Sequence, residues 1–278
     1  MDSVTIRVPA TSANLGPGYD SLGVALRLYN NVVVRRGEGS LSGMMEQVGK
    51  VFFETAELDP FDWHCSISGD VPRSRGLGSS VTVRLGILHG LNELCRRPLE
   101  REELFMLCSE LEGHPDNAAP GEFGGFTVAS RESCLAFPVE SKLKFVLLIP
   151  DFEVSTPEAR SVLPKQIPHG DAAASAANAA RITAAFASGQ YEALEGCFDD
   201  FLHQPYRKSL VPCLDAVIEA GVNAGAIGGF LSGSGSTIAC VTLKKPEAVA
   251  EAMRRALPAG IQGKTIVTTA DNHGVKRM

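Results

Sequence analysis

The residues from Arg75 to Thr82, RGLGSSVT, have the types and the spacing that bind an anion. Glycines let the backbone come close to a ligand and adopt positive φ. The serines stand where an apolar helical pattern begins, and the N-terminus of a helix attracts phosphate through unpaired N–H groups and the positive end of its dipole. Ser79 and Ser80 add hydroxyls for a phosphate or a metal ion, and Arg75 adds positive charge. We interpret the segment as a phosphate loop that opens a helix over 79–95.

The segment does not match the two commonest nucleotide-binding fingerprints. The pattern G-x-x-x-x-G-K-[ST] needs a lysine that does not follow Gly78, and the GKT at 263–265 has Pro258 where the first glycine belongs. The pattern G-x-G-x-x-G fails because Val81 stands at the position of the third glycine. For the octapeptide alone, a glycine-rich helix cap without a ligand stays an alternative.

Three other segments concentrate groups that suit a small polar ligand. Residues 9–23, PATSANLGPGYDSLG, form a long polar run before an expected strand, and 232–237, SGSGST, form a second glycine loop. Residues 112–125, EGHPDNAAPGEFGG, place a glutamate, a histidine, an aspartate and an asparagine within six positions. Taken singly, the second glycine loop also suits a hairpin turn, and the acidic segment also suits a capped turn.

The composition narrows the class of protein. The chain has 278 residues, a net charge of −6 and no basic run of five, which argues against nucleic acid and anionic membranes as main partners. Its seven cysteines are scattered without a C-x-x-C pair, which argues against a disulfide framework or a zinc site. The first residues lack the apolar core of a signal peptide, and no apolar run approaches the roughly 20 residues of a membrane span. We expect a soluble, cytoplasmic protein.

Helical and strand patterns alternate along the chain, which predicts an α+β fold. Apolar residues at spacings of three and four indicate helices, and short runs rich in Val, Ile and Leu indicate strands. The expected strands are 4–8, 22–34, 64–69, 124–129, 144–151, 226–233, 236–243 and 264–270, and the expected helices are 44–57, 81–95, 102–113, 171–187, 209–220 and 246–257. A seam near 140–155 separates a first α+β set from a second.

In their order along the chain, the polar segments resemble the motifs of the GHMP kinases. Their residues are most similar to those of the homoserine kinases of that family. The three family motifs correspond to ATSANLGPGYDSLG, PRSRGLGSSVT and SGSGST, and the segments EGHPDNAAP, STPEARSVLPK and HQPYRKSLVP are also similar. The resemblance covers nearly the whole chain. It implies a first domain over 1–145 that is like domain 2 of ribosomal protein S5, a ferredoxin-like second domain over 146–278, and an active site in the cleft between them.

The resemblance implies transfer of the γ-phosphoryl group of ATP to the hydroxyl of L-homoserine, which gives O-phospho-L-homoserine for threonine biosynthesis. Mg²⁺ prefers oxygen ligands, and the resemblance assigns it Ser80 and Glu112, with Glu110 as the alternative to Glu112. The ATP phosphates would lie against Pro72, Arg73, Ser74, Arg75, Gly76, Leu77, Gly78, Ser79, Ser80, Val81, Thr82, Ser232, Gly233 and Gly235.

Homoserine is a zwitterion, so its site needs groups of both charges. Arg160 and Arg207 match the carboxylate-binding arginines of the family, and a forked guanidinium suits a carboxylate. Asp20 matches the position that binds the ammonium group. The groups expected to line the rest of the substrate are Asn14, His114 and Asn117.

The identity of the catalytic base stays open at this point. Asp116 has the chemistry of a general base, and Asn117 and Thr156 complete the expected catalytic set, with Thr156 near the γ-phosphate. Homoserine kinases are also described without a dedicated base, with the transferred phosphate assisting. His203 is equally compatible with packing ahead of Arg207.

Two other functions are compatible with the same motifs. One is another small-molecule kinase of the family, such as a mevalonate or sugar kinase, and the other is a non-catalytic relative that binds ATP or a metabolite. The pair of arginines with an aspartate favours an amino acid over a sugar, which would need more neutral hydrogen-bonding groups. The sequence does not decide whether the protein forms a homodimer.

Overall fold

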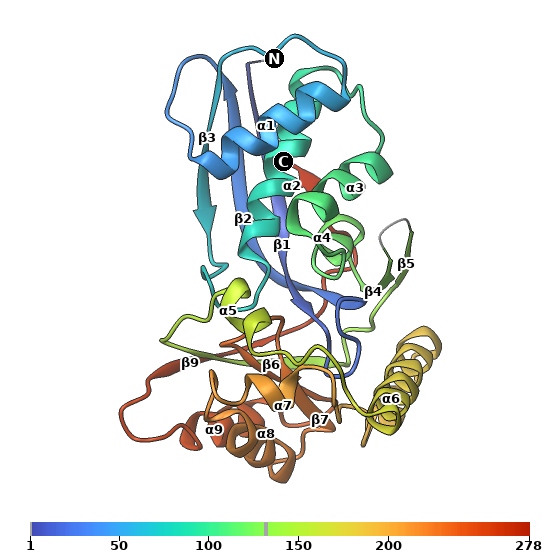
Figure 1. Cartoon of the computed structure of the whole chain (residues 1–278). Coiled ribbons are helices and arrows are strands. Elements are labelled where there is room, and N and C mark those ends of the chain that lie inside the picture. The colour runs from blue at the N-terminus through green and yellow to red at the C-terminus, as the bar shows by residue number, and fades with distance from the viewer. Residues whose placement is uncertain (1, 131–132) are drawn as a thin grey trace.

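The computed structural model describes residues 2–130 and 133–278, and Figure 1 shows them as two units stacked on each other. The strands are β1 (Ser3–Ala13), β2 (Leu22–Arg36), β3 (Trp63–Gly69), β4 (Phe126–Ala129), β5 (Cys134–Phe137), β6 (Lys144–Pro150), β7 (Gly228–Leu231), β8 (Ile238–Thr242), β9 (Gly263–Thr268) and β10 (Lys276–Arg277). The helices are α1 (Gly43–Thr55), α2 (Ser79–Leu94), α3 (Arg101–Glu112), α4 (Ala118–Phe123), α5 (Thr156–Ser161), α6 (His169–Ser188), the 3₁₀ turn η1 (Tyr191–Leu194), α7 (Gln204–Arg207), α8 (Leu214–Asn223) and α9 (Pro246–Arg255).

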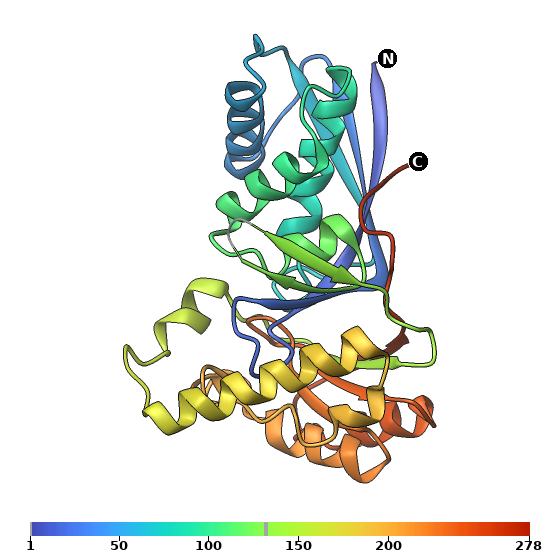
Figure 2. The same cartoon turned by 90° about the vertical axis from the view of Figure 1, so that its right-hand side faces the viewer.

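The first unit is an antiparallel sheet with helices on one side. Its strands run in the order β10-β1-β2-β4-β5, and β3 pairs with the far half of β2. Figure 2 shows α1 to α4 on a single side of this sheet. Of the predicted apolar face of α2, Val81, Leu85, Leu88 and Leu91 are fully buried, and Cys95 at the C-cap is half-buried. Helical spacing did identify the face that packs on the sheet.

The second unit is a four-stranded antiparallel sheet in the order β7-β8-β6-β9. Helices α8 and α9 pack on one of its faces, as the lower part of Figure 1 shows. The chain then returns to the first unit, where β10 pairs with β1. Strand β6 begins at Lys144 and belongs to the second sheet. We retain the division at 145/146 as a proposal. The α+β class expected from the sequence is confirmed.

An apolar cluster joins the two units. It combines Leu22 and Val24 of β2 with Phe145 and Leu147 of β6, all at most 2% exposed. The ring of Phe126 in β4 stacks on that of Phe186 in α6, with centroids 4.2 Å apart and planes 8° from parallel. Burial of apolar surface is the dominant favourable term in such packing. The units therefore share this cluster, and each unit also has a separate apolar cluster of its own.

The helix expected at 209–220 is wrong at its start. The structure places α8 from Leu214 to Asn223, and the residues before it form turns. Pro212 explains the difference, because proline lacks an N–H and disfavours helical φ and ψ in the residue before it. The short elements α4, α5, β5 and β10 were not predicted. Within the described ranges, no helix is long and apolar enough to cross a membrane.

Candidate active site

Residues from both units line one cleft of about 500 Å³. The cleft lies between the start of α2 and the short helix α5, and the loop between β1 and β2 reaches into it. It contains most of the residues that the sequence singled out. These are Asn14, Asp20, Arg73, Ser74, Arg75, Gly76, Gly78, Ser79, Ser80, Glu112, His114, Asp116, Asn117, Thr156, Arg160, Arg207 and Gly233.

The phosphate loop depends on glycine for its shape. Gly78 precedes α2 with a φ of 66°, a left-handed conformation that glycine adopts without strain. A Cβ atom at Gly78 would overlap Thr11 Oγ1, and one at Gly76 would overlap the carbonyl oxygen of Ser232. The first N–H groups of a helix have no helical partner, and the start of α2 lines the cleft. This end of α2 can therefore bind an anion.

The second glycine loop packs against the first. Ser232 Oγ donates to the carbonyl oxygen of Gly76 at 2.6 Å, and Asn14 Nδ2 donates to the carbonyl oxygen of Gly233 at 3.1 Å. Some predicted nucleotide residues are not among the described residues that line the cleft. These are Pro72, Leu77, Val81, Thr82, Ser232 and Gly235. The side chains of Leu77, Val81 and Thr82 are buried, which leaves only their backbone for a nucleotide.

Arg75 holds the phosphate loop to the second unit. Its Nε donates to the carbonyl oxygen of Pro150 at 3.0 Å, and its Nη2 donates to that of Asp151 at 2.9 Å. Its Nη1 forms an ion pair with Glu153 at 3.1 Å. We expected the guanidinium of Arg75 to be free to bind a phosphate. In this structure it is instead largely paired with groups at the end of β6.

The two groups expected to bind Mg²⁺ lie side by side. Ser80 Oγ donates to Glu112 Oε2 at 3.1 Å, and Glu112 also forms an ion pair with Arg84. Glu110 is exposed and is not among the described residues that line the cleft. A carboxylate beside a hydroxyl at the end of a phosphate loop is an oxygen donor set that suits Mg²⁺. The geometry favours Glu112 over Glu110.

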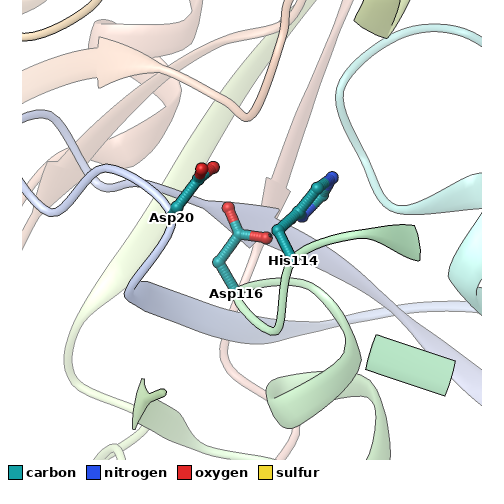
Figure 3. A group of neighbouring side chains, drawn as sticks. All are labelled: Asp20, His114 and Asp116. Carbon is teal, nitrogen blue, oxygen red and sulfur yellow. Dashed lines mark hydrogen bonds and ion pairs between the residues drawn. The ribbon is translucent and has the colours of Figure 1, made fainter. Parts of the chain in front are cut away.

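Three titratable side chains form a further group in the cleft. Asp20, His114 and Asp116 each offer a ligand atom, all within 4.8 Å of one another, and Figure 3 shows Asp116 between the other two. His114 Nδ1 lies 2.5 Å from Asp116 Oδ1. Burial lowers the pKa of His114, but the hydrogen bond to Asp116 and the charges of Asp116 and Asp20 outweigh it, so the pKa is raised overall. This corner of the cleft favours positively charged groups.

Both predicted arginines reach the same corner, and both already have partners. Arg160 Nη2 forms an ion pair with Asp20 Oδ1 at 2.8 Å. Arg207 is 2% exposed, and its Nε donates to the carbonyl oxygen of Ala159 at 3.0 Å. Its Nη1 contacts His203 Nδ1 at 3.1 Å and the carbonyl oxygen of Gly233 at 3.0 Å. Among the described residues, Nη2 of Arg207 has no hydrogen-bond partner. It is therefore the atom of the guanidinium that is best placed to bind a ligand.

His203 has a defined role beside Arg207. It is fully buried, and its Nε2 donates to the carbonyl oxygen of Gly16 at 2.8 Å, so its Nδ1 is the acceptor for Arg207. Burial lowers the pKa of His203 to about 4; the charge of Arg207 acts in the same direction, while Asp200 opposes both. The ring is therefore neutral near pH 7 and fixes the guanidinium of Arg207, which goes beyond the packing role that the sequence left open.

Sequence patterns gave no signal for one wall of the cleft. Met44, Met45, Ile67 and Val83 form an apolar surface beside the phosphate loop. They come from α1, β3 and α2, so only the folded chain brings them together. Tyr19 was also missed as a site residue: its hydroxyl accepts a hydrogen bond from Arg160 Nη1 at 2.8 Å.

Comparisons with known proteins agree with this geometry. The family described as GHMP kinases N terminal domain matches residues 43–125, and the family described as GHMP kinases C terminal matches 171–259. A homoserine kinase of Clostridium beijerinckii is 39% identical, with 98% of this chain and 97% of that protein covered. The crystal structure of homoserine kinase from Cytophaga hutchinsonii superposes with a TM-score of 0.91 at 26% identity, covering 100% and 98% of the two chains. Mevalonate kinase from Methanococcus jannaschii shares the fold, with a TM-score of 0.73 at 16% identity and coverage of 96% and 98%.

Proposed function

The chain belongs to the GHMP kinase family, among its homoserine kinases, and we propose that it transfers the γ-phosphoryl group of ATP to the hydroxyl of L-homoserine. One observation carries this proposal. The phosphate loop at the start of α2 opens into the same cleft as Asp20, Arg160 and Arg207, which supply both charges that a zwitterionic amino acid requires. A neutral sugar carries neither charge and so cannot form an ion pair with any of them.

The reaction needs positioning and neutralisation of charge more than covalent help from the protein. The hydroxyl oxygen of homoserine forms a bond to the γ-phosphorus, and the bond from that phosphorus to the bridging oxygen of ADP breaks. The N–H groups at the start of α2 hold the phosphates, and Asn117 and Thr156 lie in the same cleft. Arg207 holds the carboxylate of the amino acid through its Nη2.

Asp116 is our candidate for the acceptor of the hydroxyl proton. It is 2% exposed, lines the cleft and is bonded to His114. The hydrogen bond to His114 holds the carboxylate of Asp116 in the cleft, where it can accept a proton. Assistance by the transferred phosphate is the competing mechanism, and it would leave an Asp116→Asn variant largely active.

The remaining surfaces of the cleft have roles that suit ATP and Mg²⁺. Glu112 and Ser80 would hold the metal ion, which when bound neutralises charge on the phosphates. The apolar wall formed by Met44, Met45 and Ile67 suits the flat face of a base. This wall comes from α1 and β3 of the first unit, whereas Arg160 and Arg207 come from α5 and α7 of the second, which suits separate positions for ATP and the amino acid.

Steady-state measurement of ADP release tests the proposal. We expect Mg²⁺-dependent ADP release that requires L-homoserine, with kcat/KM well above the values for mevalonate, galactose and L-serine. L-Serine is one methylene shorter, so its hydroxyl falls short of the phosphate, and misplacement of this kind costs on the order of 100-fold. Equal or higher activity with any of those three compounds would refute the assignment of the substrate.

A further inference from the structure

The two groups proposed for opposite ends of the substrate are bonded to each other in the free protein. Arg160 Nη2 lies 2.8 Å from Asp20 Oδ1, although the two residues are 140 positions apart in the chain. Both side chains are about one third exposed, at 38% and 33%. The cleft thus contains its own carboxylate and its own cation, already paired, where a zwitterion is expected to bind.

Both sides of this ion pair are fixed to the rest of the protein. The backbone N–H of Asp20 donates to Asn14 Oδ1 at 3.0 Å, and Asp20 has a φ of 55°. Arg160 makes a second bond to the same loop, because the hydroxyl of Tyr19 accepts from its Nη1 at 2.8 Å. On the opposite side, the carbonyl oxygen of Ala159, the residue before Arg160, accepts from Arg207 Nε. The pair therefore connects the loop after β1 to helix α5 across the mouth of the cleft.

We propose that the amino acid binds by exchange with this internal ion pair. The ammonium group of the ligand replaces Arg160 on the carboxylate of Asp20, and the carboxylate of the ligand replaces Asp20 on the guanidinium of Arg160. The proposal rests on the proposed function, because it takes L-homoserine as the ligand. It adds that each charged group of the substrate must displace a member of the Asp20–Arg160 pair. This competition determines which class of substrate can bind.

Exchange makes the two charges of the ligand depend on each other. A ligand with both charges gives each member of the pair a new partner, so one ion pair is broken and two are formed. A ligand with one charge must separate the pair and leave one member without a partner, which costs free energy that the ligand cannot recover. The internal pair therefore selects against alcohols that carry only a carboxylate or only an ammonium group.

Two substrates that each lack one charge test the exchange. 4-Hydroxybutanoate lacks the ammonium group and 3-amino-1-propanol lacks the carboxylate. In Asp20→Asn, Arg160 is released, so kcat/KM for 4-hydroxybutanoate should rise above the wild-type value by about threefold or more. In Arg160→Gln, Asp20 is released, and kcat/KM for 3-amino-1-propanol should rise in the same way. Both variants should lose at least about tenfold with L-homoserine.

Glu158→Gln is the matched control. Glu158 is exposed on α5, the helix that carries Arg160, and its substitution removes one negative charge, as Asp20→Asn does. It should leave the ranking of the three substrates unchanged; an equal rise for 4-hydroxybutanoate in this variant would assign the effect to net charge and overturn the proposal. If wild type phosphorylates L-homoserine but neither variant gains activity on its one-charge substrate, exchange is excluded while the proposed function stands. Absence of wild-type activity with L-homoserine would instead exclude the proposed function. Thermal unfolding confirms that the variants compared are folded.

Discussion

The two ends of the cleft are built from different groups. At the phosphate end, the ligand would meet backbone N–H groups and small side chains, and the shape comes from glycines such as Gly78, where an added Cβ would overlap a neighbouring residue. At the amino acid end, it would meet long charged side chains from separate segments, each already bonded to another. Changes at the phosphate end should therefore alter folding together with binding, whereas changes at the amino acid end should alter which ligand is chosen.

The largest effect is expected at the amino acid end, from Arg207→Ala. Loss of one side of a buried charged pair costs roughly 2–5 kcal/mol, which corresponds to a fall in kcat/KM for L-homoserine of roughly 30-fold to several thousand-fold. The KM for ATP should change by no more than about twofold if the two ends act independently. Steady-state kinetics with each substrate varied in turn measures both values.

Arg207→Lys is the companion variant. An ammonium group cannot reproduce the three bonds of Arg207 and still offer a further N–H to the ligand, so we expect only partial recovery. If both variants stay within about twofold of wild type, Arg207 behaves as an exposed charge and does not bind the carboxylate.

Glu112→Gln should affect the phosphate end through the metal ion. We expect kcat to fall by at least about tenfold and the Mg²⁺ concentration for half-maximal rate to rise, because a carboxylate ligand is lost. Glu110→Gln is the matched control, two positions away and exposed, and it should leave both quantities near the wild-type values. A larger effect from Glu110→Gln would reverse the assignment of the metal ligand. Titration of Mg²⁺ at saturating ATP and L-homoserine provides the comparison.

Gly78→Ala tests whether the phosphate loop is limited by shape. The added Cβ would overlap Thr11 Oγ1 at positive φ, and we expect a loss of stability of about 1–3 kcal/mol. Gly113→Ala is the control, because Gly113 also has positive φ, at 84°, but has open space around its Cβ position. Urea unfolding should show a smaller loss for Gly113→Ala than for Gly78→Ala. Equal losses would mean that φ alone, and not close approach, fixes the loop.

The smallest effect is expected from two substitutions of His203, which test its two hydrogen bonds one at a time. His203→Asn places a carbonyl oxygen near the position of Nδ1 and can keep the bond to Arg207, whereas His203→Gln places an amide N–H near Nε2 and can keep the bond to Gly16. We expect the KM for L-homoserine to rise by roughly two- to tenfold in His203→Gln and less in His203→Asn. The opposite order would show that the bond to Gly16 is the one that matters.

The pH dependence of stability follows from the same residue. The pKa of His203 is lowered from 6.5 to about 4, so the unfolded chain binds more protons than the folded chain between these values. This contribution to stability is complete above pH 6.5 and is lost as the pH falls toward 4. Both His203 variants should therefore lose less stability than wild type across this window, as measured by urea unfolding.

Local patterns in the sequence were enough to predict the glycine turn that opens α2 and the buried face of that helix. The glycines and the three- to four-residue spacing act within a few residues, so the chain itself displays them. Helix α4 could not be predicted in this way, since Pro120 and Gly121 lie inside it and both disfavour helix. The packing of α4 against α2, α3 and β4 overrides those preferences.

The partners within the site were beyond sequence reasoning for a different reason. Resemblance to the family gave Asp20, Arg160 and Arg207 as binding groups, but the sequence does not show that Asp20 and Arg160 pair with each other. Arg207 receives its partners from three separate segments, at Ala159, His203 and Gly233. The Asp20–Arg160 contact depends on the relative placement of the two units, and the contacts of Arg207 depend on the folding of the second unit. No local pattern encodes either.

The apolar cluster between the units limits how the enzyme can move during turnover. Phe126 and Phe186 stack within it, and strands from both sheets contribute buried side chains. Domains connected by a large apolar interface do not separate easily, because separation would expose that surface to water. We therefore expect entry of ATP and release of the phosphorylated product to depend on short segments that line the cleft, such as α5 with Arg160, while the two sheets stay together. Hydrogen exchange during catalysis should accordingly be fast in residues 151–168 and slow in β6.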